Sequence, residues 1–394
     1  MLFKPSPADF HVEEIVRLPT SPDGAYTVYR LEKQGITTLR AQERLAAALG
    51  VPRSAVAFPA LKDKEARSVQ YGTLHGVGPA RVSGAGFFAE RVGRSDRPLS
   101  TQDLLGNRFT AVVRQLLMQE GKVIHQRLAD LEQFGFPNYF DQQRFGSYAS
   151  GQDLPGKLIL LRDAEGALRA HLAQPFAGDP SHVKAFKKEA QLHWGEWQYL
   201  LGVAPKPSNF RSVLTFLADH PQDYRQALNL VTPRVLSLYL AAYQSLLWNR
   251  LAGRYLSRML EGTKAGLIGR VKVAGEALPY YAVLTPELLH RLRAVHVPLF
   301  QQRMTIADST LGALSEEVLT GEGLRKENLK ARLLERAYLA RGTRRLLAFP
   351  TEASAGRAIT DDSKPGTFQV AVSFVLPPGS YATLMLKILM QTIE

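Results

Sequence analysis

The sequence contains no cysteine among its 394 residues. Disulfide bonds, cysteine-ligated zinc fingers, iron–sulfur clusters and thiol nucleophiles are therefore excluded. The absence of thiols also fits a protein of a reducing compartment.

Long hydrophobic runs are missing as well. The most apolar stretch, 235–248, is shorter than the roughly 20 residues that cross a bilayer, and it carries Ser237, Gln244 and Ser245. Pro5 and Pro7 interrupt the N-terminus before an apolar signal could form. We expect a cytoplasmic protein without a membrane segment.

The motifs of the common cofactor enzymes are also absent. There is no phosphate-binding G-x-x-x-x-G-K-[ST], no dinucleotide-binding G-x-G-x-x-G and no G-x-S-x-G nucleophile turn. None of the nine histidines lies in an H-E-x-x-H zinc motif. We therefore expect no metal site and no nucleotide cofactor.

Positive charge is present in excess and is clustered. The formal net charge is +13, and residues 201–350 hold 21 Lys and Arg against 11 Asp and Glu. Clustered cations are typical of a protein that binds a polyanion, because phosphates exchange their counterions for basic side chains. The alternative is a basic surface without a partner.

The length predicts two domains of about 150 residues each. Apolar periodicity predicts strands at 26–31, 109–116 and 368–376. Six helices are expected before the last of these strands, the first of them capped by Thr37 or Thr38, and a seventh helix follows it, capped by Ser380. The seven helices are expected at 37/38–50, 123–134, 181/182–201, 233/234–259, 286–295, 326–341 and 381–392. A sheet domain formed by both ends of the chain, with a helical insertion, follows from this order.

One carboxylate stands in a basic setting. Asp63 is flanked by Lys62 and Lys64, with Arg67 nearby. Nearby cations favour the ionised carboxylate, which can act as a nucleophile or base without a metal. Glu14 is a second candidate. The common alternative for both is a helix cap or a solvated side chain.

Two other segments combine rings with amides and arginine. They are 105–110, with Asn107 and Phe109, and 138–146, with three rings. Such groups can stack on an unstacked base and bind its edge. The commoner alternative is that Phe109 and Phe145 fill a core.

Several segments, in order, resemble motifs of the TruD family of RNA pseudouridine synthases. They are DFHVEE at 9–14, LKDK at 61–64 with Gln70 beyond it, GNRF at 106–109, PNYF at 137–140, QRFG at 143–146, AYQS at 242–245 with Trp248 and Asn249, and LPPGSYAT at 376–383. The resemblance extends from residue 9 to about residue 389.

The resemblance implies an RNA-modifying isomerase. Family members convert uridine to pseudouridine, and bacterial members act on uridine 13 of tRNA without a cofactor or metal. The implied fold is α+β: a catalytic domain with a mixed, largely antiparallel sheet, and a more helical inserted domain that forms an RNA-binding cleft with it. We place the catalytic domain at 1–150 and 344–394 and the insertion at 151–343, and we expect a monomer.

The resemblance also implies roles for individual residues. Asp63 matches the catalytic aspartate, which attacks C1′ of the ribose or C6 of the base, or acts through a glycal. Lys62 supports its ionised form, Phe109 matches the ring that stacks on the flipped uracil, Asn107 matches an amide that holds the loop or the substrate, and Glu14 matches a supporting acid. The basic segment, with Lys330, Arg336, Arg344 and Arg345, is expected to contact the RNA backbone.

Two positions depart from the family pattern. Ala60 replaces a usual Gly before the catalytic loop, and Asp141 follows 138–140 where Gly is common. Neither change removes a catalytic group. Three alternatives stay open: the same chemistry on another RNA target, an inactive RNA-binding protein on the same fold, and a carboxylate glycosidase that uses Asp63 and Glu14, which the basic charge disfavours.

Overall fold

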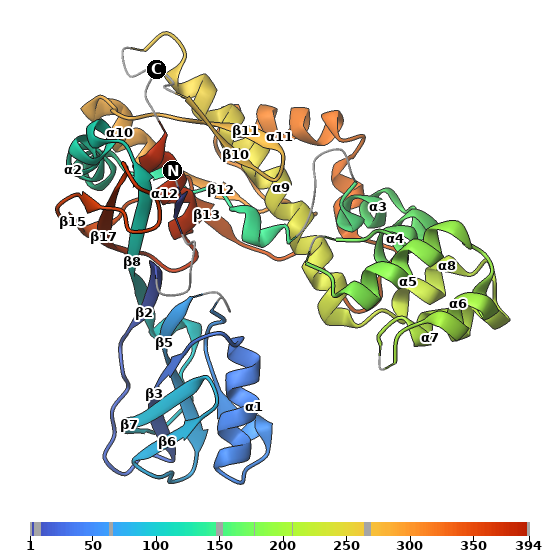
Figure 1. Ribbon diagram of the computed structural model, residues 1–394. Helices are drawn as coiled ribbons and strands as arrows, with labels where there is room; N and C mark the ends of the chain where they lie inside the picture. The colour runs from blue at the N-terminus through green and yellow to red at the C-terminus, as the bar shows by residue number, and fades with distance from the viewer. Residues whose placement is uncertain are drawn as a thin grey trace. The chain divides into compact units, whose positions relative to one another are not determined.

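The structure, a computed structural model, describes residues 2–3, 9–62, 66–146, 153–176, 178–206, 208–263 and 269–391. The chain divides into two compact units (Figure 1). Unit 1 holds Met1–Phe136 and Ala348–Thr392, and unit 2 holds Pro137–Leu347 with Ile393–Glu394. Two segments that are far apart in the sequence therefore form unit 1.

A mixed sheet forms the framework of unit 1. Its main path runs β15-β17-β8-β2-β5-β3-β7-β6, with β1, β4 and β16 paired beside it. The strands are β1 (Leu2–Phe3), β2 (Phe10–Val16), β3 (Tyr26–Lys33), β4 (Val56–Ala57), β5 (Arg67–His75), β6 (Arg81–Gly84), β7 (Phe87–Ser95), β8 (Leu104–Leu116), β15 (Thr351–Ala355), β16 (Ile359–Thr360) and β17 (Phe368–Leu376).

Every pairing described in this sheet is antiparallel except that of β2 with β5. The α+β class with a mixed, largely antiparallel sheet is confirmed. The alternation predicted for 368–376 is also observed, since Val370, Val372, Phe374 and Leu376 are buried along β17.

Within the described residues of unit 1, three α-helices pack on this sheet or on one another. They are α1 (Thr38–Ala48), α2 (Met118–Phe134) and α12 (Ala382–Met390), and two short 3₁₀ turns lie at Arg53–Ala55 and Thr101–Asp103. The hydroxyl of Thr37 accepts a hydrogen bond from the Arg40 backbone and caps α1, as predicted. The predicted Ser380 cap is wrong. Tyr381 occupies the N-cap of α12, and within the described residues the buried Ser380 hydroxyl has no hydrogen-bond partner.

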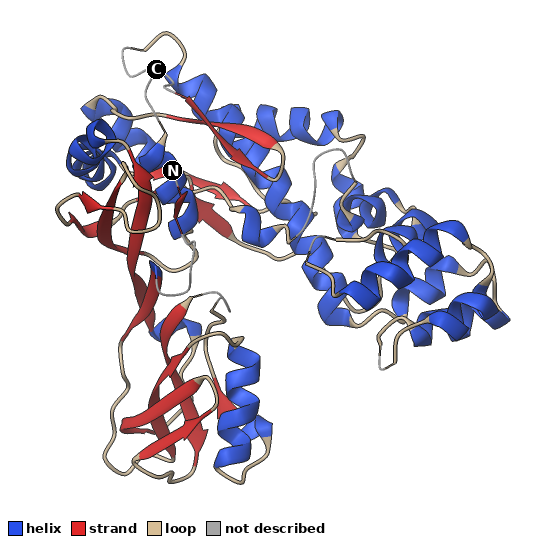
Figure 2. Ribbon diagram, viewed as in Figure 1, coloured by secondary structure: helices blue, strands red, loops and turns tan. Residues whose placement is uncertain are grey.

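Unit 2 is mainly helical (Figure 2). Its helices are α3 (Pro155–Leu161), α4 (Ala164–Leu172), α5 (Ser181–Leu192), α6 (Trp197–Val203), α7 (Arg211–Asp219), α8 (Tyr224–Asn229), α9 (Pro233–Leu260), α10 (Pro286–Arg293) and α11 (Ser309–Gly321), with 3₁₀ turns at Gln142–Arg144 and Lys326–Lys330. Its strands form two ladders, β10 (Gly269–Val273) with β11 (Glu276–Tyr280) and β12 (His296–Pro298) with β13 (Thr343–Arg345). Two short strands, β9 (Phe136–Pro137) and β14 (Leu347–Ala348), include the residues at which the chain passes between the units.

The long predicted helix at 233–259 is confirmed as α9, but the single helix at 181–201 is wrong. The chain forms α5 and α6 there, separated at Gly195. Gly195 has φ of 101°, a left-handed conformation that an α-helix cannot contain. Residues 181–201 therefore cannot form one continuous helix.

The predicted helix at 326–341 is also wrong. The segment begins with the Lys326–Lys330 3₁₀ turn and continues without a regular element to β13. Ala331 has φ of 49°, and the side chain of Asn229 donates to the Leu333 carbonyl and accepts from the Glu335 amide at 2.8 and 3.0 Å. These tertiary bonds occupy backbone groups that a helix would have used, so Lys330 and Arg341 do not share a helical face.

Among the described residues, no helix combines the length and the apolarity that crossing a bilayer requires.

Candidate active site

Asp63, the predicted nucleophile, lies outside the described residues, together with Lys64 and Glu65. The chain on both sides of it is described, up to Lys62 and again from Ala66. The described part of the candidate site therefore consists of the residues on either side of 63–65 and of the sheet of unit 1.

Strand register brings Glu14 and Asn107 together. On the antiparallel pair β2–β8, Glu14 lies opposite Asn107 and Val12 lies opposite Phe109. Because side chains alternate between the two faces of a strand, residues two apart share a face. Two motifs that are 93 positions apart in the sequence thus meet in one row of the sheet.

Lys62 joins these two residues. Its Nζ lies 3.1 Å from Oε1 of Glu14 and donates a hydrogen bond to Oδ1 of Asn107. The other carboxylate oxygen of Glu14 accepts from the Tyr71 amide at 2.8 Å. The Glu14 side chain is fully buried and that of Lys62 is 10% exposed. Further hydrogen bonds support this buried charge pair, from Lys62 to Asn107 and from the Tyr71 amide to Oε2 of Glu14. Among the described residues, Oε1 of Glu14 has the Lys62 ammonium group as its ion-pair partner and no hydrogen bond.

Glu13, the neighbouring acid, belongs to the other face of β2. It lies 3.6 Å from Arg30, and both side chains are about one third exposed. Tyr71 is close to this pair, and burial, with the nearby Glu13 charge, raises the pKa of its hydroxyl. Of the two adjacent glutamates, only Glu14 therefore contributes to the cluster with Lys62.

Thr38 and Gln70 hold the chain just before Asp63. The hydroxyl of Thr38 accepts from the Lys62 amide at 2.8 Å and donates to Oε1 of Gln70 at 2.9 Å. The amide nitrogen of Gln70 donates to the Ala60 carbonyl at 3.0 Å. Thr38 and Gln70 are both buried. Residues 60–62 are thus held both by Thr38 at the start of α1 and by Gln70 on β5.

Phe109 lies within a row of three rings. Its centroid is 5.9 Å from that of Phe10 and 5.7 Å from that of Phe374, whose ring is stacked on it at 29°. Phe109 is 8% exposed. Most of the ring contributes to the core of the sheet, and a base can reach only its exposed margin in this arrangement.

The ring-rich segment 138–146 lies in unit 2 and is bound to α9. The amide of Asn249 accepts from the Phe140 backbone and donates to its carbonyl, each at 2.8 Å. The Arg144 guanidinium donates to Oγ of Ser245 at 2.9 Å. Phe140 and Phe145 are buried. These side chains hold the unit together, in agreement with the core alternative.

The four basic residues predicted to contact RNA have different surroundings. Arg344 donates to the carbonyl and the side-chain oxygen of Asn138, both at 2.7 Å, and its guanidinium lies 4.2 Å from the centre of the Phe140 ring. Lys330, Arg336 and Arg345 are exposed. The donors of Arg344 are thus largely used inside unit 2, whereas the other three side chains face solvent.

A family model described as tRNA pseudouridine synthase D (TruD) matches residues 1–389. The chain belongs to this family. It is 26% identical over 390 residues to the tRNA pseudouridine synthase D of Aquifex aeolicus, covering 98% of this chain and 96% of the relative. It is 30% identical over 398 residues to that of Geobacter sulfurreducens, covering 99% and 94%.

The fold agrees with this membership. A crystal structure from Methanosarcina mazei that carries the same family name superposes with a TM-score of 0.73 at 23% identity, and the superposition covers 99% of this chain and 93% of that one. The likeness shows that the two proteins share the TruD fold over nearly their whole length.

Within this TruD-family chain, three predicted site residues lie together: Lys62, Glu14 and Asn107. Phe109 follows Asn107 by two positions on β8 and faces the same side. Thr38 was missed, because a threonine at a helix start was interpreted only as a cap. The signal was the pair Thr37-Thr38, of which one hydroxyl caps α1 and leaves the other for the loop.

Proposed function

We propose that the protein isomerises uridine to pseudouridine in tRNA, with uridine 13 as the target. Asp63 is the nucleophile, the target base is flipped out of its stack, and neither cofactor nor metal takes part. Family membership supports the reaction class, and the cluster of Lys62, Glu14 and Asn107 beside Asp63 supports the site. The position of Lys62 is the observation that carries the proposal.

The charge of Lys62 favours an ionised Asp63. Its ammonium group is held by Glu14 and Asn107 one residue before the nucleophile, and a nearby cation stabilises a carboxylate. Because Thr38 and Gln70 hold residues 60–62 in place, Asp63 follows a fixed segment of the chain. An activated nucleophile on a fixed support is the requirement for covalent catalysis.

The reaction exchanges one bond to the sugar for another. The carboxylate of Asp63 attacks C1′ of the ribose or C6 of the base, or a glycal forms by loss of a sugar proton. The N1–C1′ bond breaks, the uracil turns, and C5 bonds to C1′. The bond to Asp63 breaks again, or, in the glycal route, the sugar regains the proton it lost. C5 then loses its proton and N1 gains one, so the atoms balance without oxidant or reductant. Flipping costs a few kcal/mol, and contact of the base with the exposed margin of Phe109 returns part of this cost.

We further propose that the catalytic domain, 1–150 with 344–394, corresponds in the main to unit 1, and that the insertion, 151–343, corresponds to unit 2. The site residues Glu14, Lys62 and Asn107 all belong to unit 1. The predicted RNA cleft, the monomeric state and the cytoplasmic location stay predictions.

Pseudouridine mapping tests the proposal. Purified wild-type protein, Asp63→Asn and the control Asp96→Asn, an exposed aspartate of the same unit, are each incubated with an unmodified tRNA pool. We expect one new pseudouridine at position 13 with the wild type and the control, and none with Asp63→Asn. Modification elsewhere would overturn the target. Salt-sensitive tRNA binding without any modification by the wild type would favour the inactive RNA-binding alternative.

A further inference from the structure

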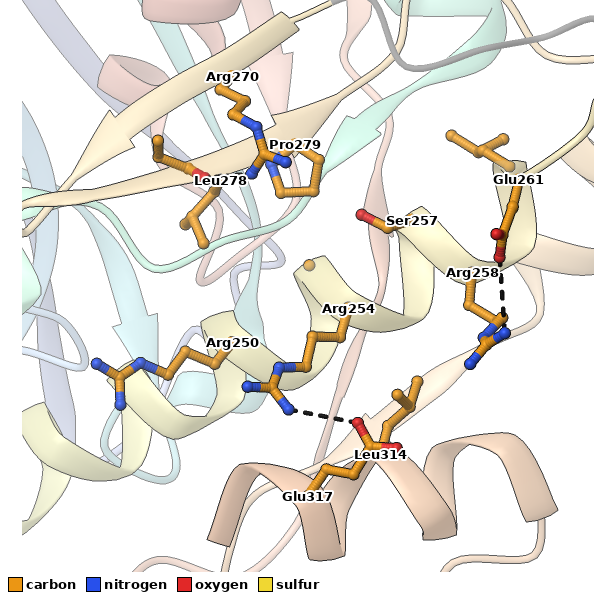
Figure 3. Close-up of a pocket in the computed structure, with 13 residues that line it drawn as sticks. Arg250, Arg254, Ser257, Arg258, Glu261, Arg270, Leu278, Pro279, Leu314 and Glu317 are labelled. Atoms are coloured by element: carbon orange, nitrogen blue, oxygen red, sulfur yellow. Dashed lines mark hydrogen bonds and ion pairs between the residues drawn. The ribbon is translucent and has the colours of Figure 1, made fainter. Parts of the chain in front are cut away.

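Unit 2 contains a groove that the proposed reaction does not use. It lies among α9, the β10–β11 hairpin and α11, and encloses about 780 Å³ (Figure 3). The hairpin packs along α9 through β11, and α11 packs on α9 as well. None of the residues that line the groove belongs to the cluster around Lys62.

Four arginines line this groove. Arg250, Arg254 and Arg258 follow one another at intervals of four along α9, and Arg270 stands on β10 across from them (Figure 3). Residues four apart share a helix face, with a rise of about 6 Å between them. This rise is of the same order as the spacing of successive phosphates along an RNA strand. The row therefore presents cations at a repeat that a nucleic acid backbone can follow.

Two glutamates, Glu261 and Glu317, also line the groove, but both are held loosely. Arg254 lies 3.4 Å from Glu317 and Arg258 lies 3.6 Å from Glu261, and the four side chains are 47 to 71% exposed. Exposed ion pairs of this kind contribute little to stability, so an incoming phosphate can replace these carboxylates.

The other two arginines have different tasks. Arg250 is bound by Glu276 and Glu322, which lie beside the groove, and is the fixed end of the row. Arg270 is exposed, and one of its nitrogens donates to the Ala277 carbonyl at 3.0 Å. In the described part of the chain no carboxylate pairs with Arg270. Arg254, Arg258 and Arg270 are thus the cations available to a ligand.

The floor of the groove between these cations leaves room for an RNA strand. Gly253 has no side chain there, those of Ser257 and Ala277 are small, and Leu278 and Pro279 add apolar surface. A ribose can rest on such a floor while guanidinium groups on both sides bind phosphate oxygens in pairs.

We propose that this groove binds the phosphodiester backbone of the RNA substrate, apart from the residues that hold the target uridine. The proposal rests on the proposed function, since it names a second contact with the same RNA. Arg254, Arg258 and Arg270 are the phosphate ligands, and Arg250 keeps α9 and the hairpin in place.

The test compares two triple variants of the full chain that remove the same charge. The groove variant carries Arg254→Ala, Arg258→Ala and Arg270→Ala. The control carries Lys188→Ala, Lys206→Ala and Arg225→Ala, which are exposed residues of unit 2 outside the groove. Binding of labelled tRNA is measured between 50 and 300 mM salt, and the rate of pseudouridine formation is measured in single turnover with saturating enzyme.

We expect the groove variant to raise the Kd for tRNA at least about tenfold and to lower the slope of log Kd against log salt by about 2, because three phosphate contacts are lost. The control should change both far less. At saturation the control should modify tRNA at the wild-type rate, since its residues lie outside the groove and outside the cluster around Lys62.

Equal Kd and equal slope for the two triple variants would overturn the groove while leaving the proposed function intact. Wild-type protein that modifies no RNA would instead overturn the proposed function, whatever the binding data show. If polyglutamate displaces labelled tRNA from the wild-type protein and poly(U) of equal charge does not, the groove binds an acidic protein segment and the proposal is wrong.

Discussion

The Nζ of Lys62 lies 3.1 Å from Oε1 of Glu14, and both side chains are withdrawn from solvent in the sheet of unit 1. Lys62 follows β4 and Glu14 lies on β2, so the pair connects the segment before Asp63 to the sheet. The backbone amide of Tyr71 on β5 binds the same carboxylate. The buried ion pair with Glu14 therefore both stabilises the charged form of Lys62 and fixes the position of its side chain.

Removal of Lys62 should destabilise the protein as well as inactivate it. Lys62→Met leaves the buried Glu14 carboxylate without its cation, at a cost of about 3–5 kcal/mol. The double variant Lys62→Met with Glu14→Gln removes both charges and should regain most of this stability but no activity. Urea unfolding and tRNA modification measure the two effects. A single variant as stable as the wild type would contradict the pairing.

Thr38 should affect catalysis more than stability. Thr38→Val removes the hydroxyl that binds the Lys62 amide and Gln70, and displacement of the loop should lower the modification rate about ten- to hundredfold. The Kd for tRNA should hold. Thr37→Ala is the matched control: it loses the α1 cap, at about 1 kcal/mol of stability, and should keep the rate. Equal rates for the two variants would remove Thr38 from the positioning of the loop.

Arg344 and Arg345 should separate into a structural and an RNA-binding residue. Arg344→Ala removes two hydrogen bonds to Asn138 and the stack on Phe140, so it should lower the unfolding temperature of unit 2. Arg345→Glu should leave that temperature near the wild-type value, weaken tRNA binding and flatten its salt dependence. Calorimetry and binding between 50 and 300 mM salt test the pair. An unchanged salt slope for Arg345→Glu would exclude it from the interface.

His171 should make unit 2 sensitive to acid. Burial, with the nearby charge of Lys187, lowers the pKa of this histidine to about 4, and its Nδ1 lies 2.7 Å from the Tyr239 hydroxyl. Well above pH 6.5, the His171 imidazole is neutral in both the folded and the unfolded protein. As the pH falls from 6.5 toward 4, only the unfolded form gains a proton, so stability decreases by about 3 kcal/mol over this range.

His171→Phe should flatten this acid dependence of unfolding between pH 6.5 and 4.5. The exposed histidine of His182→Phe serves as the control and should retain the wild-type profile. If all three proteins lose stability in parallel over this range, His171 is not the group that titrates.

Local pattern predicted those elements whose own residues decide them. The strict alternation at 368–376 is observed because β17 buries every second side chain. The long apolar helix at 233–259 is also observed, and its middle, 242–249, is buried on every side. The short motifs around Glu14, Lys62 and Asn107 also marked the site residues that meet. Their spacing in the chain could not show that Lys62 is the residue that joins the other two.

Other features required contacts between distant residues. Helix periodicity at 326–341 was overruled by the bonds of Asn229 to Leu333 and Glu335, and the exposed arginine expected at 344 is tied to Asn138. Strand register selected Glu14 over Glu13, since one faces Lys62 and the other faces Arg30.

The sequence by itself therefore determined the family and the fold class and marked the candidate site residues, because periodicity and motifs are local properties of the chain. Only the tertiary structure decided which of these side chains share a face, which are used in the core, and that four arginines of α9 and β10 line one groove. Those outcomes depend on hydrogen bonds and packing between residues that the chain keeps far apart.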